Sequence, residues 1–451
     1  MRKFSILKII LICIFAFLIG YATPVFLIAS TSKQSFFATL RNMPQRGIFS
    51  NLLKSDTLKT YSTYEQVLND LKENYCKSID VTKVTYSGIS GMLQSFDDPY
   101  TYFLEPNRYK TMKEENEGNF SGIGAVLQTN KLGQVAIREI MKDSPAGKSG
   151  LKAGDIIINV NGESAENQDL NDVVKKIRGE IGTNVVLTIV RDEQTPFDVT
   201  VTRAKINDIT VTFKMADDKN GIGYIRLHQF NQIADEEVNK AINELASQGM
   251  KAIILDLRNN PGGLLEQAVN VSSEFVNKGL IVIIQEKGGK RQYIPVNSTV
   301  QNHEIFPIIV LVNGYSASAS EIVSGAIKDN KAGIIMGSTT YGKGLVQSIV
   351  PLFDGSAVSI TTAKYLTPND IDINKKGIEP DYFVKESENF DPYEPSTDTQ
   401  LNSAIEVMKV KLGISPNSKL EAISKESEKL QKEYHKELEK KKKSEELLKE
   451  E

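Results

Sequence analysis

The chain has 451 residues, of which 40% are hydrophobic and 25% charged, and its formal net charge at pH 7 is −3. This length predicts several domains, and the composition is that of a folded protein. The near-neutral charge gives no indication of a nucleic-acid partner. No cluster of metal ligands and no phosphate loop or nucleotide fingerprint is present, so we expect neither a metal nor another cofactor.

Residues 1–30 contain an apolar stretch at 9–29, preceded by Arg2, Lys3 and Lys8. Such a run is about long enough to cross a bilayer, and the basic residues would stay in the cytoplasm. Two interpretations remain open, a cleaved signal peptide and an uncleaved membrane anchor. Both predict that the remainder is exported, to the periplasmic side of the inner membrane or as a secreted protein.

Residues 31–115 are predicted to form a linker followed by a helical segment. Tyr64, Val67 and Leu71 recur at helical spacing, which is typical of an amphipathic helix. A polar turn is predicted at 97–100, where Asp and Pro residues gather.

Residues 116–204 are predicted to form a compact unit of short strands and one helix. The strands are predicted at 123–127, 135–138, 156–160 and 185–189, and the helix at 170–177. This order resembles a PDZ domain of the form found inside bacterial proteases. The resemblance implies that a peptide C-terminus is held by strand addition while loop amides receive its carboxylate. The matching loop consists of Ser121, Gly122, Ile123 and Gly124, and its glycines permit the nest of amides that an anion needs.

Residues 205–386 alternate between strands and helices, which predicts an α/β domain. One buried strand, 252–257, is followed by the glycine pair Gly262 and Gly263. A glycine pair at that place lets main-chain amides face a ligand, although Asn-Pro-Gly is turn-prone in any case.

The apolar run 305–312 reads as a second buried strand, and helical periodicity begins after Ser320. Ser318 therefore lies in a strand-to-helix turn, beside helix N-terminal amides that can receive an oxyanion. That is a suitable place for a nucleophilic hydroxyl. The alternative is that Ser318 is only a helix N-cap, with Glu321 completing a capping box.

A serine nucleophile needs a base, and none of the three histidines, His228, His303 and His435, lies in a motif with small neighbours. The base is therefore expected to be a lysine whose pKa is lowered by burial. Lys343 lies between two glycines just before a predicted strand, and Gln347 would share its face and orient its amine. The alternative for Lys343 is an ordinary surface lysine in a glycine turn.

The motifs at 316–322 and 341–347 resemble those of the C-terminal processing peptidases, also called tail-specific proteases. The likeness extends over about residues 61–384. It implies that Ser318 is the nucleophile, that Lys343 is the base and that Gln347 supports the lysine. The implied activity is that of a serine endopeptidase that recognises free substrate C-termini and cleaves exported or envelope proteins near them.

The family resemblance also implies roles for other residues. Gly262 or Gly263 would supply one oxyanion donor and Ala319 the other. Arg178 matches a position that couples substrate binding to activation, whose alternative is a surface arginine in a turn. The N-terminal helical segment would make a homodimer, or would only pad the peptidase core. The family's Asp-Pro-His-Ser is matched only in part, because this chain has Tyr100 and Thr101 in the last two positions.

The expected fold is multidomain α+β, with a membrane segment, a helical segment, a PDZ domain, a crotonase-like or ClpP-like α/β peptidase domain and a helical tail. The polar tail, residues 387–451, contains a short amphipathic helix predicted at 400–408, and its Lys- and Glu-rich part, 419–451, is predicted to be a solvated helix or disordered. Two other functions remain open: a catalytically inactive, membrane-anchored PDZ adaptor on a peptidase scaffold, and a crotonase-like acyl-CoA enzyme.

Overall fold

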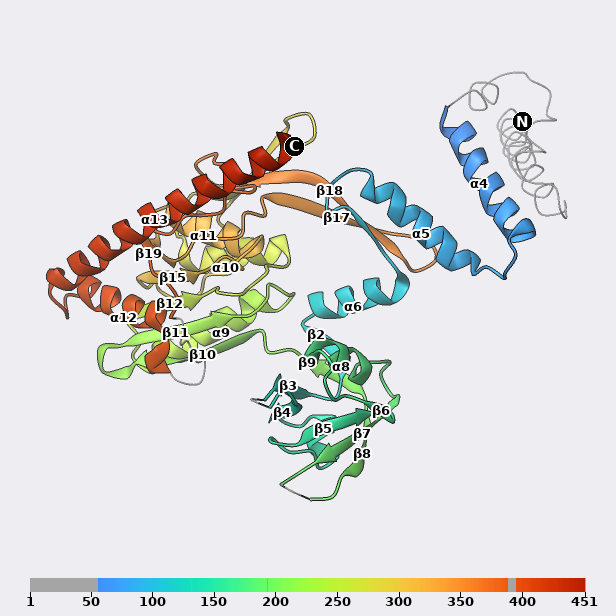
Figure 1. The fold of residues 1–451 in the computed structure, drawn as a ribbon. Coiled ribbons are helices and arrows are strands. Elements are labelled where there is room, and N and C mark those ends of the chain that lie inside the picture. Colours follow the sequence, from blue (N-terminus) through green and yellow to red (C-terminus); the bar gives the residue numbers. More distant parts are fainter. Residues whose placement is uncertain (1–55, 131, 193, 388–394, 451) are drawn as a thin grey trace, which may run out of the picture. The chain divides into compact units, whose positions relative to one another are not determined.

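The structure is a computed structural model that describes residues 56–130, 132–192, 194–387 and 395–450 (Figure 1). The apolar segment predicted to be a signal peptide or anchor lies outside these residues. None of the described helices is long and apolar enough to cross a membrane. The chain divides into two compact units, Met1–Gly91 and Met92–Glu451.

The described part of the first unit is helical, as predicted. It consists of α4 (Asp56–Asn74) and the beginning of α5 (Val81–Gln94). The two helices touch where Gly88 leaves room for a ring, because a side chain at Gly88 would lie 3.1 Å from the Tyr64 hydroxyl. Other apolar side chains of α4, among them Val67 with 53% of its surface exposed, are not covered within this unit.

A small β-rich domain occupies the position predicted for the PDZ domain. Helix α8 (Leu170–Ile177) contributes Val173 and Ile177 to its separate apolar core. Strand β3 lies at one edge of the main sheet and bonds only to β4, so its outer edge has no partner among the described strands. The entering strand β2 (Asn119–Gly122) pairs with the leaving strand β9 (Ala204–Asn207). The main sheet has the order β3 (Ala125–Thr129), β4 (Val135–Ile140), β5 (Ile156–Val160), β7 (Asn184–Val190) and β8 (Phe197–Thr202), with β6 (Glu163–Ser164) beside β5 and the short helix α7 (Pro145–Lys148) after β4.

The α/β domain predicted over 205–386 is built on a six-stranded sheet in which every neighbouring pair is parallel except β10 and β11. The two central strands β12 and β15 are buried over their whole length, which explains why both read as continuous apolar runs in the sequence. In spatial order the strands are β10 (Val211–Asp217), β11 (Ile222–Leu227), β12 (Ala252–Asp256), β15 (Ile308–Val312), β16 (Gly333–Gly337) and β19 (Tyr382–Phe383).

Helices cover both faces of this sheet (Figure 1). One face packs against α9 (Ala234–Ser247), α10 (Leu265–Phe275) and α11 (Ala319–Asp329). The other packs against α12 (Thr399–Lys411) and the first turns of α13 (Asn417–Glu450). The sequence analysis placed α12 in a polar tail, whereas its Leu401, Ala404, Val407 and Met408 are buried against the sheet. The prediction missed this because one short amphipathic stripe does not say what it packs against.

A second sheet carries the lysine motif. Its strand β17 (Leu345–Pro351) forms a hairpin with β18 (Ala357–Leu366) immediately after Lys343. The short strand β1 (Tyr102–Leu104) also pairs with β18, so the turn predicted at 97–100 is brought from far away in sequence to the lysine side of the domain. The remaining strands are β13 (Leu280–Glu286) and β14 (Arg291–Pro295), and α6 (Pro106–Asn116) follows β1.

Candidate active site

Ser318 lies in a sharp turn between strand β15 and helix α11, as the sequence predicts. Its backbone has φ 55° and ψ −113°, a conformation that side-chain-bearing residues rarely adopt. The turn is held on both sides, because the Ala317 N–H donates to the Asn260 carbonyl oxygen (3.1 Å) and the Tyr341 N–H to that of Ser316 (3.0 Å). Backbone strain of this kind persists only where the surroundings fix it, and it is frequent at functional sites.

The glycine pair lies directly against Ser318. A Cβ on Gly262 would lie 2.8 Å from both the Ser318 Cβ and the Ala319 nitrogen, so only glycine permits this approach. The Gly262 N–H donates to Asn260 Oδ1 (2.9 Å) and is therefore not free. The N–H groups of Gly263 and Ala319 donate to no protein acceptor among the described residues. Of the two predicted glycines, the geometry thus favours Gly263 as the partner of Ala319 in an oxyanion site.

The Lys343 side chain is half-buried, and its ammonium nitrogen lies 4.9 Å from the centroid of the Tyr100 ring. Burial lowers the pKa of Lys343 below its ordinary value, while the negative charge of Glu321 acts in the opposite direction. Burial and a hydrogen bond with Tyr341 raise the pKa of Tyr100 to about 12. Lys343 therefore has the lowered proton affinity that a lysine base requires.

Gln347 lies on β17 two residues after Leu345, as the sequence analysis assumed, and a face shared with Lys343, which comes just before the strand, stays a prediction. The pairing with β18 shifts between Val346 and Gln347, where Thr362 of β18 is the extra residue, so the alternation along β17 itself is kept. The Gln347 Nε2 atom is buried and has no hydrogen-bond partner among the described residues. A buried amide without a partner is costly, which makes it a group ready to bond another side chain or a ligand.

The PDZ loop has its carbonyl groups turned into the domain. The Ile123 carbonyl oxygen accepts from the Ala146 N–H (2.8 Å), and that of Gly124 accepts from the Met141 N–H (3.0 Å). Because C=O and the following N–H point in opposite directions across a trans peptide, the next two amides face away from these bonds. Gly124 has φ 73°, and the Ser121 hydroxyl donates to the Gly179 carbonyl oxygen. The loop is thus built with outward amides beside the free edge of β3.

Arg178 lies next to Gly179 rather than in the loop. Its Nη1 is 3.5 Å from Glu115 Oε1, and its guanidinium lies 5.0 Å from the Phe120 ring centroid. The Ser121 hydroxyl donates to the carbonyl oxygen of Gly179, the residue after Arg178. A role in coupling substrate binding to activation stays a prediction.

The sequence analysis missed residues that hold these loops together. Asn260 donates its side-chain amide to the Leu227 carbonyl oxygen (2.7 Å) and fixes Gly262. Tyr365 donates its hydroxyl toward the carbonyl oxygens of Ser318 and Lys343. The contacts of Asn260 with Leu227 and of Tyr365 with Ser318 and Lys343 join separate segments of the chain, so no local pattern could have identified them.

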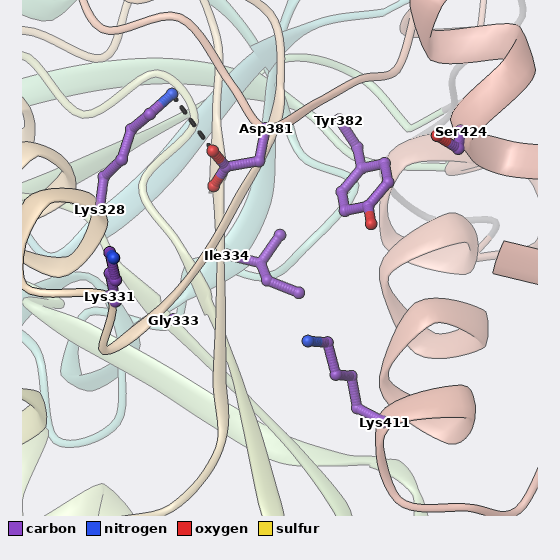
Figure 2. A pocket seen from close by; sticks show the side chains of 8 residues that line it. All are labelled: Lys328, Lys331, Gly333, Ile334, Asp381, Tyr382, Lys411 and Ser424. Carbon is purple, nitrogen blue, oxygen red and sulfur yellow. Dashed lines mark ion pairs between the residues drawn. The ribbon is translucent and has the colours of Figure 1, made fainter. Parts of the chain in front are cut away.

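A cavity of about 400 Å³ lies at the other end of the six-stranded sheet (Figure 2). It opens where β16 begins, whereas Ser318 follows the end of β15. Figure 2 shows Lys328 turned toward Asp381, with which it forms an ion pair of 3.2 Å. The cavity contains none of the predicted site residues, and it is lined by Lys328, Lys331, Gly333, Ile334, Asp381, Tyr382, Lys411 and Ser424.

Comparison with known families agrees with this division of the chain. The model of peptidase family S41 matches residues 221–384, and that of the PDZ domain matches residues 137–191. A CtpA-like serine protease of Staphylococcus saprophyticus is 38% identical over 335 residues, which are 74% of this chain and 67% of that protein. The chain belongs to peptidase family S41. As a member of this family it is a serine-type peptidase, and the predicted multidomain fold with PDZ and α/β peptidase domains is confirmed.

Solved structures of S41 relatives cover most of the chain. The photosystem II D1 C-terminal processing protease is 33% identical, over 74% of this chain and 88% of that one, with a TM-score of 0.46. An S41 protease from Bacteroides fragilis is 18% identical and shares the fold, covering 78% of this chain and 98% of that one with a TM-score of 0.50. The chain spans about two thirds of the length of the staphylococcal relatives, 67% in one case and 64% in another.

Proposed function

We propose that this S41 peptidase is a serine endopeptidase that uses Ser318 and Lys343 to cleave exported proteins near their C-termini. One observation carries the proposal. The backbone amides of Ser318 and Lys343 both bond to one carboxylate oxygen of Glu321, so the two motifs meet at one place. The N–H groups of Gly263 and Ala319, which donate to no acceptor among the described residues, are the neighbours in sequence of Gly262 and Ser318, which lie against each other.

The reaction follows from these groups. The neutral amine of Lys343 takes the proton from the Ser318 hydroxyl as Oγ bonds to the substrate's carbonyl carbon. The oxyanion that forms is stabilised by the N–H groups of Gly263 and Ala319. When the C–N bond breaks, the lysine ammonium gives its proton to the leaving amine, and water then hydrolyses the acyl-enzyme by the same steps.

The PDZ domain supports recognition of free C-termini. The outer edge of β3 can accept an added peptide strand, and the amides that follow Ile123 and Gly124 face away from the domain's own bonds. A terminal carboxylate would accept hydrogen bonds from those amides. We also propose that the N-terminal apolar segment holds the enzyme outside the cytoplasm, as the sequence predicts.

Two measurements test the function. Mass spectrometry of a model protein's fragments should show new C-terminal cuts with wild type and none with Ser318→Ala. Amidation of the substrate's C-terminus removes the charge that the loop amides bind, so cleavage should slow markedly while the dyad stays competent. Equal rates for amidated and free substrates would reject C-terminal recognition and leave the endopeptidase activity standing.

The alternative of an inactive PDZ adaptor is favoured by one observation, since Lys343 rests over Tyr100 while the Gln347 amide has no partner among the described residues. An adaptor would bind free C-termini with equal affinity in wild type and Ser318→Ala, without any cleavage.

A homodimer through the N-terminal helices is supported by the exposed apolar side chains of α4. Tyr61 is 57% exposed and Leu71 is 38% exposed. Sedimentation of wild type against Val67→Glu tests this proposal, and a monomeric wild type would reject it.

A further inference from the structure

Glu321 is a fully buried carboxylate at the centre of the site, with 0% of its surface exposed. It lies in the first turn of α11, three residues after the nucleophile. Its Oε2 accepts from the backbone N–H groups of Ser318 (2.9 Å) and Lys343 (2.8 Å). Its Oε1 accepts from the Thr340 hydroxyl (2.6 Å) and the Gly342 N–H (2.7 Å). One side chain thus ties the serine turn to the lysine loop.

These bonds fit the ionised form of Glu321. Each of its four partners is a donor, and two carboxylate oxygens offer about four acceptor positions, so none is left for a proton. Burial raises the pKa of Glu321 above its ordinary value, although the four hydrogen bonds act in the opposite direction. The positive end of α11 adds further stabilisation to a negative charge in the first turn.

The charge of Glu321 also acts on the base. Two titratable groups act on the Lys343 amine, Glu321 on α11 by its charge and Tyr100 before β1 by its ring. Two others lie close by, since Tyr341 bonds to Tyr100 and Tyr365 on β18 donates to the Lys343 carbonyl oxygen. Burial raises the pKa of Tyr365 well above its ordinary value, and that of Tyr100 is also raised, so both hydroxyls stay neutral while a lysine base works. Glu321 is then the charge in this group that opposes the effect of burial on Lys343.

We propose that Glu321 is a positioning residue that aligns Ser318 with Lys343 and sets the pH at which the lysine becomes a base. The inference rests on the proposed Ser318–Lys343 mechanism. A helix cap would need only the bond to Ser318. The three further bonds, to Thr340, Gly342 and Lys343, all go to the loop that carries the base. Any displacement of this carboxylate moves both members of the dyad.

The test measures the activation of Ser318 directly. An alkyl fluorophosphonate is the probe: the serine Oγ bonds to phosphorus, fluoride leaves, and the proton passes to Lys343. The rate of labelling of wild type and Glu321→Gln is followed against pH. The neutral amide introduced by this substitution cannot accept all four bonds, and a misplacement of about 1 Å costs roughly 10²-fold in rate. The maximal rate should therefore fall by about that factor.

The pH profile separates positioning from simple structural damage. Removing the negative charge stops Glu321 from favouring the lysine ammonium, so the rising limb of the profile should move to lower pH. A loosened site would instead admit water and move that limb to higher pH. The expected signature is a lower maximum together with a shift to lower pH.

Glu274→Gln is the matched control, because Glu274 is also buried (1% exposed) and hydrogen-bonded but lies outside this cluster. It should leave the labelling rate and its pH dependence unchanged. Glu321→Asp keeps the charge but draws it back by one methylene, so the rate should fall with little change in pH dependence.

The outcomes distinguish this inference from the proposed function. If wild type is not labelled, or Ser318→Ala still cleaves protein, the dyad itself is wrong. If wild type is labelled at Ser318 and Glu321→Gln has the same rate and profile, the dyad stands and the role of Glu321 is rejected. If neither Glu321 variant folds, as judged by the absence of a cooperative unfolding transition, while Glu274→Gln folds, the carboxylate is a folding determinant. The positioning role is then rejected as well.

Discussion

The two ends of the six-stranded sheet differ in kind. At the carboxyl ends of β12 and β15, loops are packed so closely that Gly262 has no room for a Cβ, and one carboxylate gathers four donors. At the amino end of β16 there is an open cavity of about 400 Å³ with three lysines on its lining (Figure 2). The proposed catalytic residues Ser318 and Lys343 lie at the closely packed end.

The difference teaches that cavity size does not locate this site. A peptidase acts on an extended chain, so it needs aligned groups more than an enclosed volume. The carboxyl ends of parallel strands provide that alignment, because successive loops converge there. Lysines around an open cavity keep their hydration, and their ion pairs contribute little.

The largest expected effect concerns the two kinds of lysine. Lys343→Arg should lower peptide cleavage by on the order of 10⁴-fold, since arginine does not deprotonate and members of a catalytic unit act together. Lys411→Arg, at the cavity of the other end, should leave kcat/KM within about twofold. Steady-state kinetics on one peptide measures both. A comparable loss of kcat/KM in the two variants would show that the two ends of the sheet do not differ in catalytic importance.

A second contrast sets a buried ion network against a surface ion pair. Asp398 bonds to the buried Arg258 through both oxygens (2.8 Å each) and caps α12 through the Leu401 N–H (2.9 Å). Asp398→Ala should lower the free energy of unfolding by about 3–5 kcal/mol, because Arg258 loses a buried partner. Lys328→Ala, which breaks the half-exposed pair with Asp381, should cost less than about 1 kcal/mol. Urea unfolding measures both losses of free energy, and equal losses in the two variants would show that burial does not determine the contribution of these ion pairs.

The smallest effect concerns pH and the connection that enters β15. His303 Nε2 lies 2.8 Å from Glu274 Oε2, and both side chains are buried. Burial alone would lower the pKa of His303, but the bonds to Glu274 and to the Glu304 carbonyl oxygen outweigh it and raise the pKa.

A raised folded-state pKa means that folding favours the proton. The stabilisation is fully present below the unfolded pKa of about 6.5 and is lost as pH rises through the higher folded value. The difference in Tm between wild type and His303→Gln should therefore shrink as pH rises across this range. A difference that grows with pH would show that the pair is held neutral.

Local patterns in the sequence were sufficient for much of this fold. Three kinds of element could be predicted from a few neighbouring residues each: the apolar strands β12 and β15, the small-residue turn at Ser318 and the glycine turn around Lys343. Family resemblance supplied the chemistry that such patterns leave open. The PDZ strands were found for the same reason, because each is short, alternating and bounded by turn residues.

What the sequence could not supply is long-range contact. Glu321 fits a capping box, and only the fold shows that three of its four bonds reach the loop of Lys343. The Gly262 amide was an acceptable oxyanion donor until Asn260 was found to occupy it. The extra residue Thr362 of β18, opposite the step from Val346 to Gln347, also depends on the pairing of two strands, which no single strand reveals.

The burial of α12 has a consequence for the order in which the chain is made. Arg258 stands at the base of the loop that carries Gly262 and Gly263, and its partner Asp398 is 140 residues further along the chain. Until Asp398 and α12 have been synthesised, Ile254, Leu311 and Met336 lack the helix that buries them. We expect a chain ended at Val384, where the family match stops, to remain unlabelled by fluorophosphonate. The peptidase activity would then appear only when synthesis of the chain is almost complete, and incomplete chains would not cleave other proteins.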